Sequence, residues 1–201
     1  MRVLGVDPGS RFLGYGLVEN ARPRPRYLAH GVVRAGTTAP LAERLEAIFL
    51  ELGRVIDVFS PDAIAVEGVF THKNARSALI LGHARGVVLL LAARARVPVF
   101  EYAPARVKRA IGAGGNDSKE SVARMVTRLL ALTVPLERAD AYDALAIACC
   151  HAHQAGALAS GRRGARAGVG GAAGFASRLQ PNVVRPAAAV VAPGFAGDVE
   201  P

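Results

Sequence analysis

The sequence has little of what marks a secreted or membrane protein. It contains no tryptophan and only two cysteines, Cys149 and Cys150, which are adjacent and poorly placed for a structural disulfide. This usage excludes a disulfide-stapled domain and predicts a reducing, cytoplasmic location. No secretory signal is expected, because Arg2 and Asp7 interrupt the first residues. The longest membrane-like run, residues 86–93, is far shorter than the roughly 20 residues that span a bilayer, so no membrane association is expected.

Acidic residues are fewer than basic ones. The chain of 201 residues has 25 lysines and arginines against 16 aspartates and glutamates, which gives a formal net charge of +9. A surplus of cations attracts phosphate groups, so the balance favours a polyanionic partner such as nucleic acid. A ribosomal protein, or a genome biased toward arginine codons, would show the same balance. The charge alone therefore does not assign a function.

Large apolar residues become scarce after about residue 155. Residues 155–201 consist mainly of alanine, glycine, proline and arginine, and their few large apolar side chains follow no period. Such a segment cannot bury enough apolar surface to offset the entropy lost on ordering. We therefore predict one globular domain at residues 1–154, followed by a disordered basic tail at residues 155–201.

The apolar periodicity of the domain predicts an α/β fold. Three strands joined by short turns form an antiparallel meander, and two later strands that flank a helix form a parallel pair. The strands are expected at residues 2–7, 12–19, 26–34, 60–67 and 97–102, and the helices at residues 40–59, 74–94, 104–111, 118–132 and 138–153. A mixed five-stranded sheet flanked by helices and beginning with a meander is the ribonuclease H-like architecture, which is the fold we predict.

The stretch GVDPGSRFLGYG joins the first two strands and has four possible interpretations. It could be a plain hairpin, a nucleotide-binding loop, a phosphate-binding turn of the actin and sugar-kinase type, or a strand end that presents Asp7 to a metal. A Rossmann loop is disfavoured because the chain enters a strand, not a helix, after Gly9. A kinase-type ATPase would need a second such loop and a second domain, which the chain does not show. A hairpin and a metal carboxylate are compatible, since glycine permits the tight reversal after Asp7.

Four carboxylates occupy positions suited to metal ligands. Asp7 and Glu67 each end a predicted strand, while Asp140 and Asp143 lie three apart on one face of a predicted helix. Each could instead serve a turn or a helix cap, but Glu67 follows the apolar run AIAV, where an acid seldom stays ionised without a partner. Two Mg²⁺ ions about 3.5 to 4 Å apart would relieve the repulsion among four carboxylates and clamp a phosphodiester, with Mn²⁺ as a substitute. The pattern therefore favours metal-dependent hydrolysis of a nucleic-acid backbone.

Four blocks of the chain resemble the motifs of RuvC-type Holliday junction resolvases, in order and at compatible spacing. They are GVDPGSRFLGYG, AVEGVFTHKNARSALILGHARG, VFEYAPARVKRAIGAGG and ADAYDALAIACCHAH, and they extend to about His153. The resemblance implies a homodimeric endonuclease of DNA recombination and repair that places paired, symmetric nicks in a four-way junction and leaves ligatable 5′-phosphate ends. It also implies the RuvA–RuvB branch-migration complex as a partner. By this match Asp7, Glu67, Asp140 and Asp143 are the catalytic metal ligands.

The resemblance also implies residues that contact DNA. Lys108 and Lys119 align with basic residues that touch the backbone near the cut. Lys119 lies in the first turn of a predicted helix, where the dipole disfavours a cation, so an anionic ligand would explain its position. An ordinary solvated lysine is the alternative. Phe70 could stack on an unpaired base at the crossover or belong to the core, and Lys73 and Arg76 are further candidates for phosphate or junction-centre contacts.

A stripe of small residues runs along the predicted helix at 74–94. Ala78, Gly82 and Gly86 recur at every fourth position and make one smooth face. Glycine costs about 1 kcal/mol relative to alanine inside a helix, so two in one stripe indicate that another helix approaches closely. Packing within the monomer is one possibility. The resemblance favours a two-fold dimer interface, and a dimer supplies the two active sites that symmetric cutting requires.

Some features depart from the family pattern or suggest other functions. Gly68 replaces a residue that is more often polar, and residues 113–116 lack the arginine and asparagine usual before the lysine helix. An inactive junction-binding protein is disfavoured because all four acids are present, and an RNA nuclease of the same fold is disfavoured by the lysine and KNARSALILGHARG blocks. Zinc at Cys149 and His153 is disfavoured because the chain has no second ligand cluster.

Overall fold

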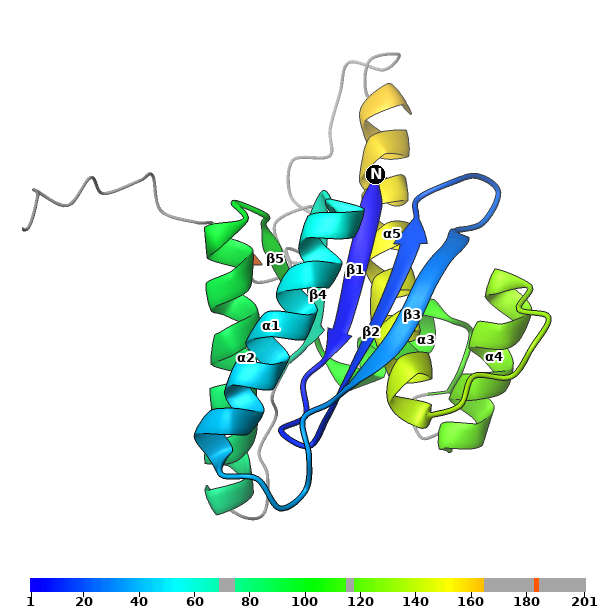
Figure 1. Cartoon of the computed structure of the whole chain (residues 1–201). Helices are drawn as coiled ribbons and strands as arrows, with labels where there is room; N and C mark the ends of the chain where they lie inside the picture. The colour runs from blue at the N-terminus through cyan, green and yellow to red at the C-terminus, as the bar shows by residue number, and fades with distance from the viewer. Residues whose placement is uncertain (69–74, 115–117, 165–182, 185–201) are drawn as a thin grey trace, which may run out of the picture.

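A computed structural model describes the chain at residues 1–68, 75–114, 118–164 and 183–184 (Figure 1). Five helices surround one sheet. The elements are β1 (Arg2–Asp7), β2 (Phe12–Glu19), β3 (Arg26–Arg34), α1 (Leu41–Phe59), β4 (Ala63–Glu67), α2 (Ala75–Arg94), β5 (Val99–Tyr102), α3 (Pro104–Ala110), α4 (Lys119–Leu130), α5 (Ala139–Gly164) and β6 (Val183–Val184).

The sheet has the predicted mixed topology. Its strand order is β3-β2-β1-β4-β5-β6, with β1, β2 and β3 antiparallel and β4 parallel to both β1 and β5. The meander and the parallel pair around α2 are therefore confirmed. Val6 of β1 lies opposite Val66 of β4, so the carboxyl ends of these two strands are adjacent.

All five predicted strands are present, and the structure differs from the prediction in two details. The two-residue strand β6 pairs antiparallel with β5, with Val184 opposite Val99, and α5 continues to Gly164 instead of ending near His153. An unpaired strand edge is a template for any extended segment, and two valines are too short a run to show a period. Residues 155–164 contain no proline to stop the helix and include alanine, leucine and arginine, although three of the ten are glycine. The division at residue 154 itself stays a prediction.

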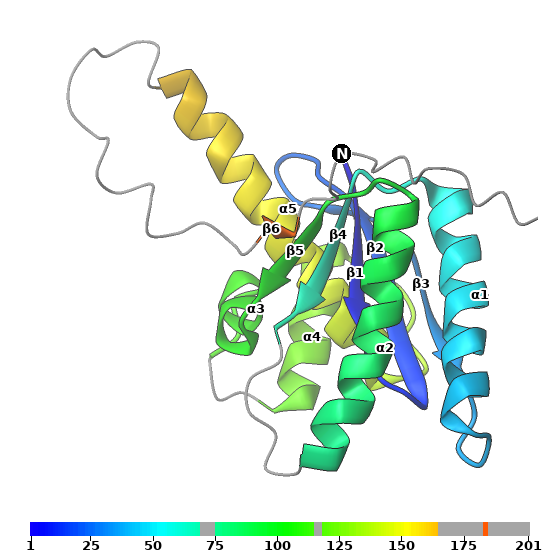
Figure 2. The same cartoon turned by 90° about the vertical axis from the view of Figure 1, so that its left-hand side faces the viewer.

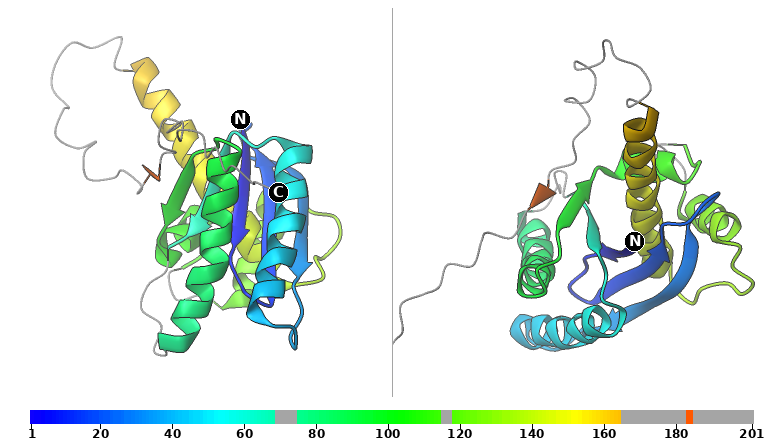
Figure 3. Two further views of the ribbon diagram at one scale, coloured as in Figure 1. Left: turned by 60° about the vertical axis from the view of Figure 1, so that its left-hand side comes forward. Right: turned by 90° about the horizontal axis from the view of Figure 1, so that it is seen from above.

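Helices cover both faces of the sheet (Figure 2). On one face, α1 and α2 bury side chains such as Ile48, Leu52 and Val88 against Leu4 and Leu17 of the strands. The other face packs against α5, with α3 and α4 beside it, as the view from above shows (Figure 3). Because side chains alternate along a strand, each strand end presents one residue to each layer.

The helix α5 lies directly on the backbone of β1 and β2. A Cβ atom built on Gly5 would lie 2.0 Å from the Ala144 carbonyl oxygen, and one on Gly14 would lie 2.0 Å from the Asp140 carbonyl oxygen. Only glycine permits this approach, because any side chain would overlap the helix backbone. The approach brings the first turns of α5 beside the end of β1.

The described part of the chain covers the helix α2 on one side only. Ala84, Val88 and Leu91 are buried, whereas the side chains of Leu79 and Leu90 are 66% and 53% exposed. By length and composition alone the whole of α2 could cross a membrane, whereas the apolar run at residues 86–93 is too short to do so. Packing on α1 and the sheet explains the apolar side chains on the inner face of α2. The apolar side chains on its outer face need another explanation.

Candidate active site

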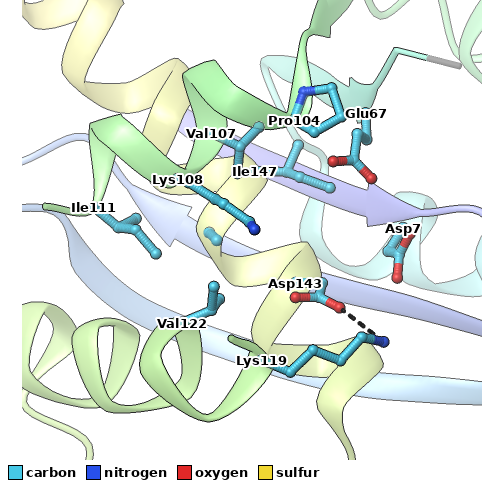
Figure 4. A pocket seen from close by; sticks show the side chains of 11 residues that line it. Asp7, Glu67, Pro104, Val107, Lys108, Ile111, Lys119, Val122, Asp143 and Ile147 are labelled. Atoms are coloured by element: carbon cyan, nitrogen blue, oxygen red, sulfur yellow. Dashed lines mark ion pairs between the residues drawn. The ribbon is translucent and has the colours of Figure 1, made fainter. Parts of the chain in front are cut away.

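The strands and α5 bring three of the four predicted metal ligands to one hollow. Asp7 and Glu67 end β1 and β4 on the face covered by α5, because Gly5 and Ala65, two residues earlier, face the same layer. Asp143 enters from the second turn of α5. Figure 4 shows the three carboxyl groups around one space. The volume of this space is about 300 Å³. The hollow is lined by Asp7, Glu67, Pro104, Val107, Lys108, Ile111, Lys119, Val122, Asp143, Ala146 and Ile147.

Two predicted DNA-binding lysines line the same hollow. Lys119 is the first residue of α4, and the N-cap residue Ser118 accepts a hydrogen bond from the Ser121 amide. The Nζ atom of Lys119 lies 3.9 Å from Asp143 Oδ2. Lys108 enters from α3. Only three of the chain's 25 lysines and arginines are lysines, and Lys73 is the third. Both lysines that lie within the described residues therefore line this hollow.

Asp140 lies beside the hollow but does not line it. Its Oδ2 accepts a hydrogen bond from Arg138 Nε at 3.0 Å, and the Arg138 guanidinium carbon is 3.7 Å from the centroid of the Phe12 ring. The structure therefore brings Asp140 close to the other carboxylates while an arginine holds it. The sequence did not indicate Arg138 or Phe12, although Arg138 is only two residues from Asp140.

The carboxylates of the site repel one another. Burial, followed by the charges of Asp143, Glu67 and Asp140, raises the pKa of Asp7 to about 7, and Lys119 opposes the shift. Burial is also the main cause that raises the pKa of Glu67 and of Asp143, with both lysines acting in the opposite direction. Two lysines thus do not compensate the negative charge, and an added cation would be stabilised here.

The donor set fits an open site for a hard divalent cation. The candidate ligands Asp7, Glu67 and Asp143 all offer carboxylate oxygens, which Mg²⁺, Mn²⁺ and Ca²⁺ prefer. Within the described part of the chain, no three His, Cys, Asp or Glu side chains form a ready-made metal cage. Mg²⁺ commonly keeps several waters and binds through one or two carboxylates plus substrate phosphates, so an incomplete protein cage is compatible with it.

The CCHAH segment makes structural contacts. Burial raises the pKa of the Cys149 thiol to about 12 and that of Cys150 to about 11. His151 Nδ1 lies 2.6 Å from the Tyr102 hydroxyl oxygen, and His153 Nδ1 lies 2.9 Å from the Ala110 carbonyl oxygen. These contacts account for both histidines without zinc.

The remaining predicted residues lie away from the hollow or outside the described residues. Arg76 is exposed in the first turn of α2, while Phe70 and Lys73 fall outside the described residues. Ala78 is half-buried, and Gly82 and Gly86 are exposed, with no atom within 4 Å of a Cβ built on either glycine. Within the described residues, the small-residue stripe of α2 therefore faces open space, not another helix of the monomer.

Comparison with known proteins gives a consistent assignment. The family model for crossover junction endodeoxyribonuclease RuvC matches residues 3–151. The RuvC of Myxococcus xanthus is 54% identical over 190 residues, covering 94% of this chain and 100% of that protein. The RuvC of Sorangium cellulosum is 52% identical over 160 residues, covering 80% and 89%.

Solved structures confirm the ribonuclease H-like fold. Thermus thermophilus RuvC in complex with a Holliday junction substrate is 37% identical with a TM-score of 0.71, covering 78% of this chain and 96% of that chain. The yeast mitochondrial Holliday junction resolvase Ydc2 is 14% identical with a TM-score of 0.59, covering 82% and 83%, and supports the fold alone. The chain belongs to the crossover junction endodeoxyribonuclease RuvC family.

Proposed function

We propose that this protein resolves four-way DNA junctions by hydrolysing one phosphodiester in each of two symmetry-related strands. The observation that carries the proposal is the hollow in which Asp7, Glu67 and Asp143 meet Lys108 and Lys119, in a chain of the RuvC family. The Thermus thermophilus relative, solved with a Holliday junction substrate, supports the same substrate here. The products would be nicked duplexes with 5′-phosphate ends that a ligase can seal.

Members of the family depend on a divalent metal, and we infer that this chain uses two Mg²⁺ ions, with Mn²⁺ as a substitute. Asp7, Glu67 and Asp143 would hold them, joined by Asp140 once Arg138 releases its carboxylate. Bound divalent cations neutralise the carboxylates, activate a water for attack and stabilise the leaving 3′ oxygen. Burial, followed by repulsion from the neighbouring carboxylates, raises the pKa of Asp7 to about 7, and a bound cation would relieve that repulsion.

The two lysines bind and orient the DNA backbone in this proposal. Lys119 Nζ, 3.9 Å from Asp143, and Lys108 across the hollow would donate to non-bridging oxygens of the phosphate being cut. Each ammonium offers charge-assisted hydrogen bonds, which are stronger than neutral ones. They would place the scissile phosphate against the carboxylates. Phe70, Lys73 and Arg76 remain proposed contacts nearer the junction centre.

The assay that tests the function compares a mobile four-way junction with linear duplex of the same sequence. With Mg²⁺, we expect paired nicks at symmetric positions in the junction and products that DNA ligase reseals. The linear duplex should stay intact under the same conditions. Equal cutting of both substrates, or no cutting of the junction at any divalent metal concentration, would contradict the proposal.

The RuvA–RuvB complex is the proposed partner, and the cytoplasm is the proposed location. Cofractionation of this protein with RuvA–RuvB from a cytoplasmic extract would test both.

We propose that the outer face of α2 forms the homodimer interface. Among the described residues, no atom lies within 4 Å of a Cβ built on Gly82 or Gly86 of its small-residue stripe, and the exposed Leu79 and Leu90 provide apolar surface that a second copy would bury. This assignment accounts for the apolar outer half of α2 without a membrane. Two copies related by a two-fold axis would present two active sites to a junction that is itself nearly two-fold symmetric.

A charge on this stripe should separate the subunits without unfolding them. A Gly82→Glu side chain meets no atom within 4 Å of its Cβ in the monomer, and glutamate is the better helix former by close to 1 kcal/mol. Light scattering after gel filtration should give twice 20.9 kDa for the wild type and 20.9 kDa for the variant. The matched control is Val134→Glu, on an exposed residue after α4, which should remain dimeric. A dimeric Gly82→Glu protein would rule out this face.

A further inference from the structure

The Arg85 side chain connects α2 to the ends of two strands. It is 12% exposed, its Nη1 donates to the Glu67 carbonyl oxygen at 2.7 Å, and its Nη2 lies 2.5 Å from Glu101 Oε1. Glu101 lies on β5, where its side chain is 22% exposed. A charged group this buried is stable only when paired, and Glu101 provides the pairing.

The peptide that follows Glu67 is held at both of its polar groups. Its carbonyl oxygen accepts from Arg85, and its amide, the N–H of Gly68, donates to the Tyr102 carbonyl oxygen at 2.8 Å. Two hydrogen bonds on opposite sides of one planar peptide restrict its rotation. A fixed peptide plane also fixes a backbone dihedral of Glu67. The direction in which the Glu67 side chain leaves the strand end is therefore restricted as well.

Arg85 acts from the opposite side of the sheet to the carboxylate that it would control. Glu101 shares a face with Val99, which packs under α1 and α2, whereas the Glu67 side chain shares a face with Ala65, under α5. Arg85 is not among the residues that line the hollow. It therefore has no access to a phosphate in the hollow, and its direct link to the site is the Glu67 backbone carbonyl.

We propose that Arg85 is a positioning residue that holds Glu67 in its place among the carboxylates, with Glu101 orienting the guanidinium. The inference rests on the proposed nuclease function. The planar guanidinium presents separate N–H groups to a carbonyl and a carboxylate at once. A lysine at this position has one ammonium and satisfies the two acceptors less well. Misplacement of a catalytic group by about 1 Å can cost roughly a hundredfold in rate.

The experiment must separate positioning from stability. Arg85→Met leaves the half-buried Glu101 without its cation and should lower the thermal midpoint, so reduced cleavage by this variant alone would be ambiguous. The double variant Arg85→Met/Glu101→Met removes both charges, and it should recover most of the lost midpoint while the Glu67 carbonyl stays untethered. Arg94→Met is the matched control, since Arg94 lies on the same helix with its guanidinium 5.8 Å from the Phe49 ring, away from the hollow.

Three measurements follow on these proteins. We expect the double variant to cleave the junction in single turnovers about tenfold to a hundredfold more slowly, with junction affinity in EDTA changed by less than about threefold. The Mg²⁺ concentration for half-maximal cleavage should rise. In the absence of DNA, MnCl₂ should raise the thermal midpoint of the double variant less than it raises that of the wild type. Arg85→Lys should fall between the wild type and the double variant, and Arg94→Met should match the wild type.

The outcomes distinguish this inference from the function on which it rests. If the wild type cuts junctions and the double variant cuts as fast with the same Mg²⁺ requirement, Arg85 has no positioning role. If the wild type does not cut junctions, the proposed function fails, and the MnCl₂ shift still decides the inference. An equal shift in wild type and double variant would then overturn it.

Discussion

Asp7→Asn should abolish junction cleavage while junction binding is retained. Asp7 is the carboxylate on which the repulsion of the other three converges, and asparagine keeps its size but removes the charge that would hold a cation. We expect a loss of roughly a thousandfold in single-turnover rate, which corresponds to about 4 kcal/mol of transition-state stabilisation. Affinity for the junction, measured in EDTA, should stay the same or increase, because one negative charge is removed from the DNA-facing hollow.

The same substitution should stabilise the metal-free protein, and the gain should depend on pH. The pKa of Asp7 is about 7 in the folded protein against an ordinary value of 3.8, so folding favours the protonated form. The wild type therefore loses stability as the pH rises from about 4 through 7, whereas asparagine has no proton to lose. In EDTA, the thermal midpoint of Asp7→Asn should exceed that of the wild type by several degrees at about pH 8 and by much less at about pH 5.

A surface aspartate provides the control for both effects. Asp57 is exposed on α1, and Asp57→Asn should leave cleavage and the pH dependence of the midpoint unchanged. Addition of MgCl₂ should narrow the gap in midpoint between the wild type and Asp7→Asn, because a ligand that binds only the native carboxylates stabilises the wild type. Cleavage at the wild-type rate by Asp7→Asn would remove the basis for the catalytic assignment.

Gly14→Ala should damage both the fold and the site, although its side chain adds only a methyl group. The new Cβ would lie 2.0 Å from the Asp140 carbonyl oxygen and 2.5 Å from its carbon, and backbone atoms cannot move aside like the end of a flexible side chain. The first turn of α5 must shift away from β2. Overpacking of this kind costs about 1 to 3 kcal/mol or more, equivalent to a lower thermal midpoint by roughly 2 to 4 °C for each kcal/mol.

The shift should also displace Asp140 and Asp143 from β1 and β4. We expect a loss of roughly a hundredfold in cleavage, measured well below the thermal midpoint of the variant. Gly53→Ala is the matched control, because its Cβ would meet Leu91 Cδ2 at an ordinary 3.5 Å inside α1. That variant should be neutral or slightly stabilised, since alanine is the better helix former. If Gly14→Ala were as stable and active as Gly53→Ala, α5 would not lie as close to β2 as the structure has it.

Most of the sheet could be predicted from sequence because its cues are local. Alternation marked β1, β2 and β3, and the short turns between them left an antiparallel meander as the simple solution. The helix between β4 and β5 required those strands to be parallel. The two-residue β6 and the extension of α5 had no comparable cue. The strand β6 depends on the free edge of β5, and the extension of α5 depends on the absence of a residue that ends the helix.

The sequence by itself determined which residues belong to the candidate site. Asp7 and Glu67 were recognisable as acids that end apolar strands, and Asp143 as an acid on the same helix face as Asp140. Only the tertiary structure decided how these groups meet. The glycines at positions 5 and 14 bring α5 onto the sheet, Arg138 holds Asp140 beside the hollow, and Arg85 reaches the Glu67 carbonyl from the opposite face. The reason is physical: a strand or helix pattern depends on near neighbours in the chain, whereas each of these contacts joins atoms whose separation depends on how whole elements pack.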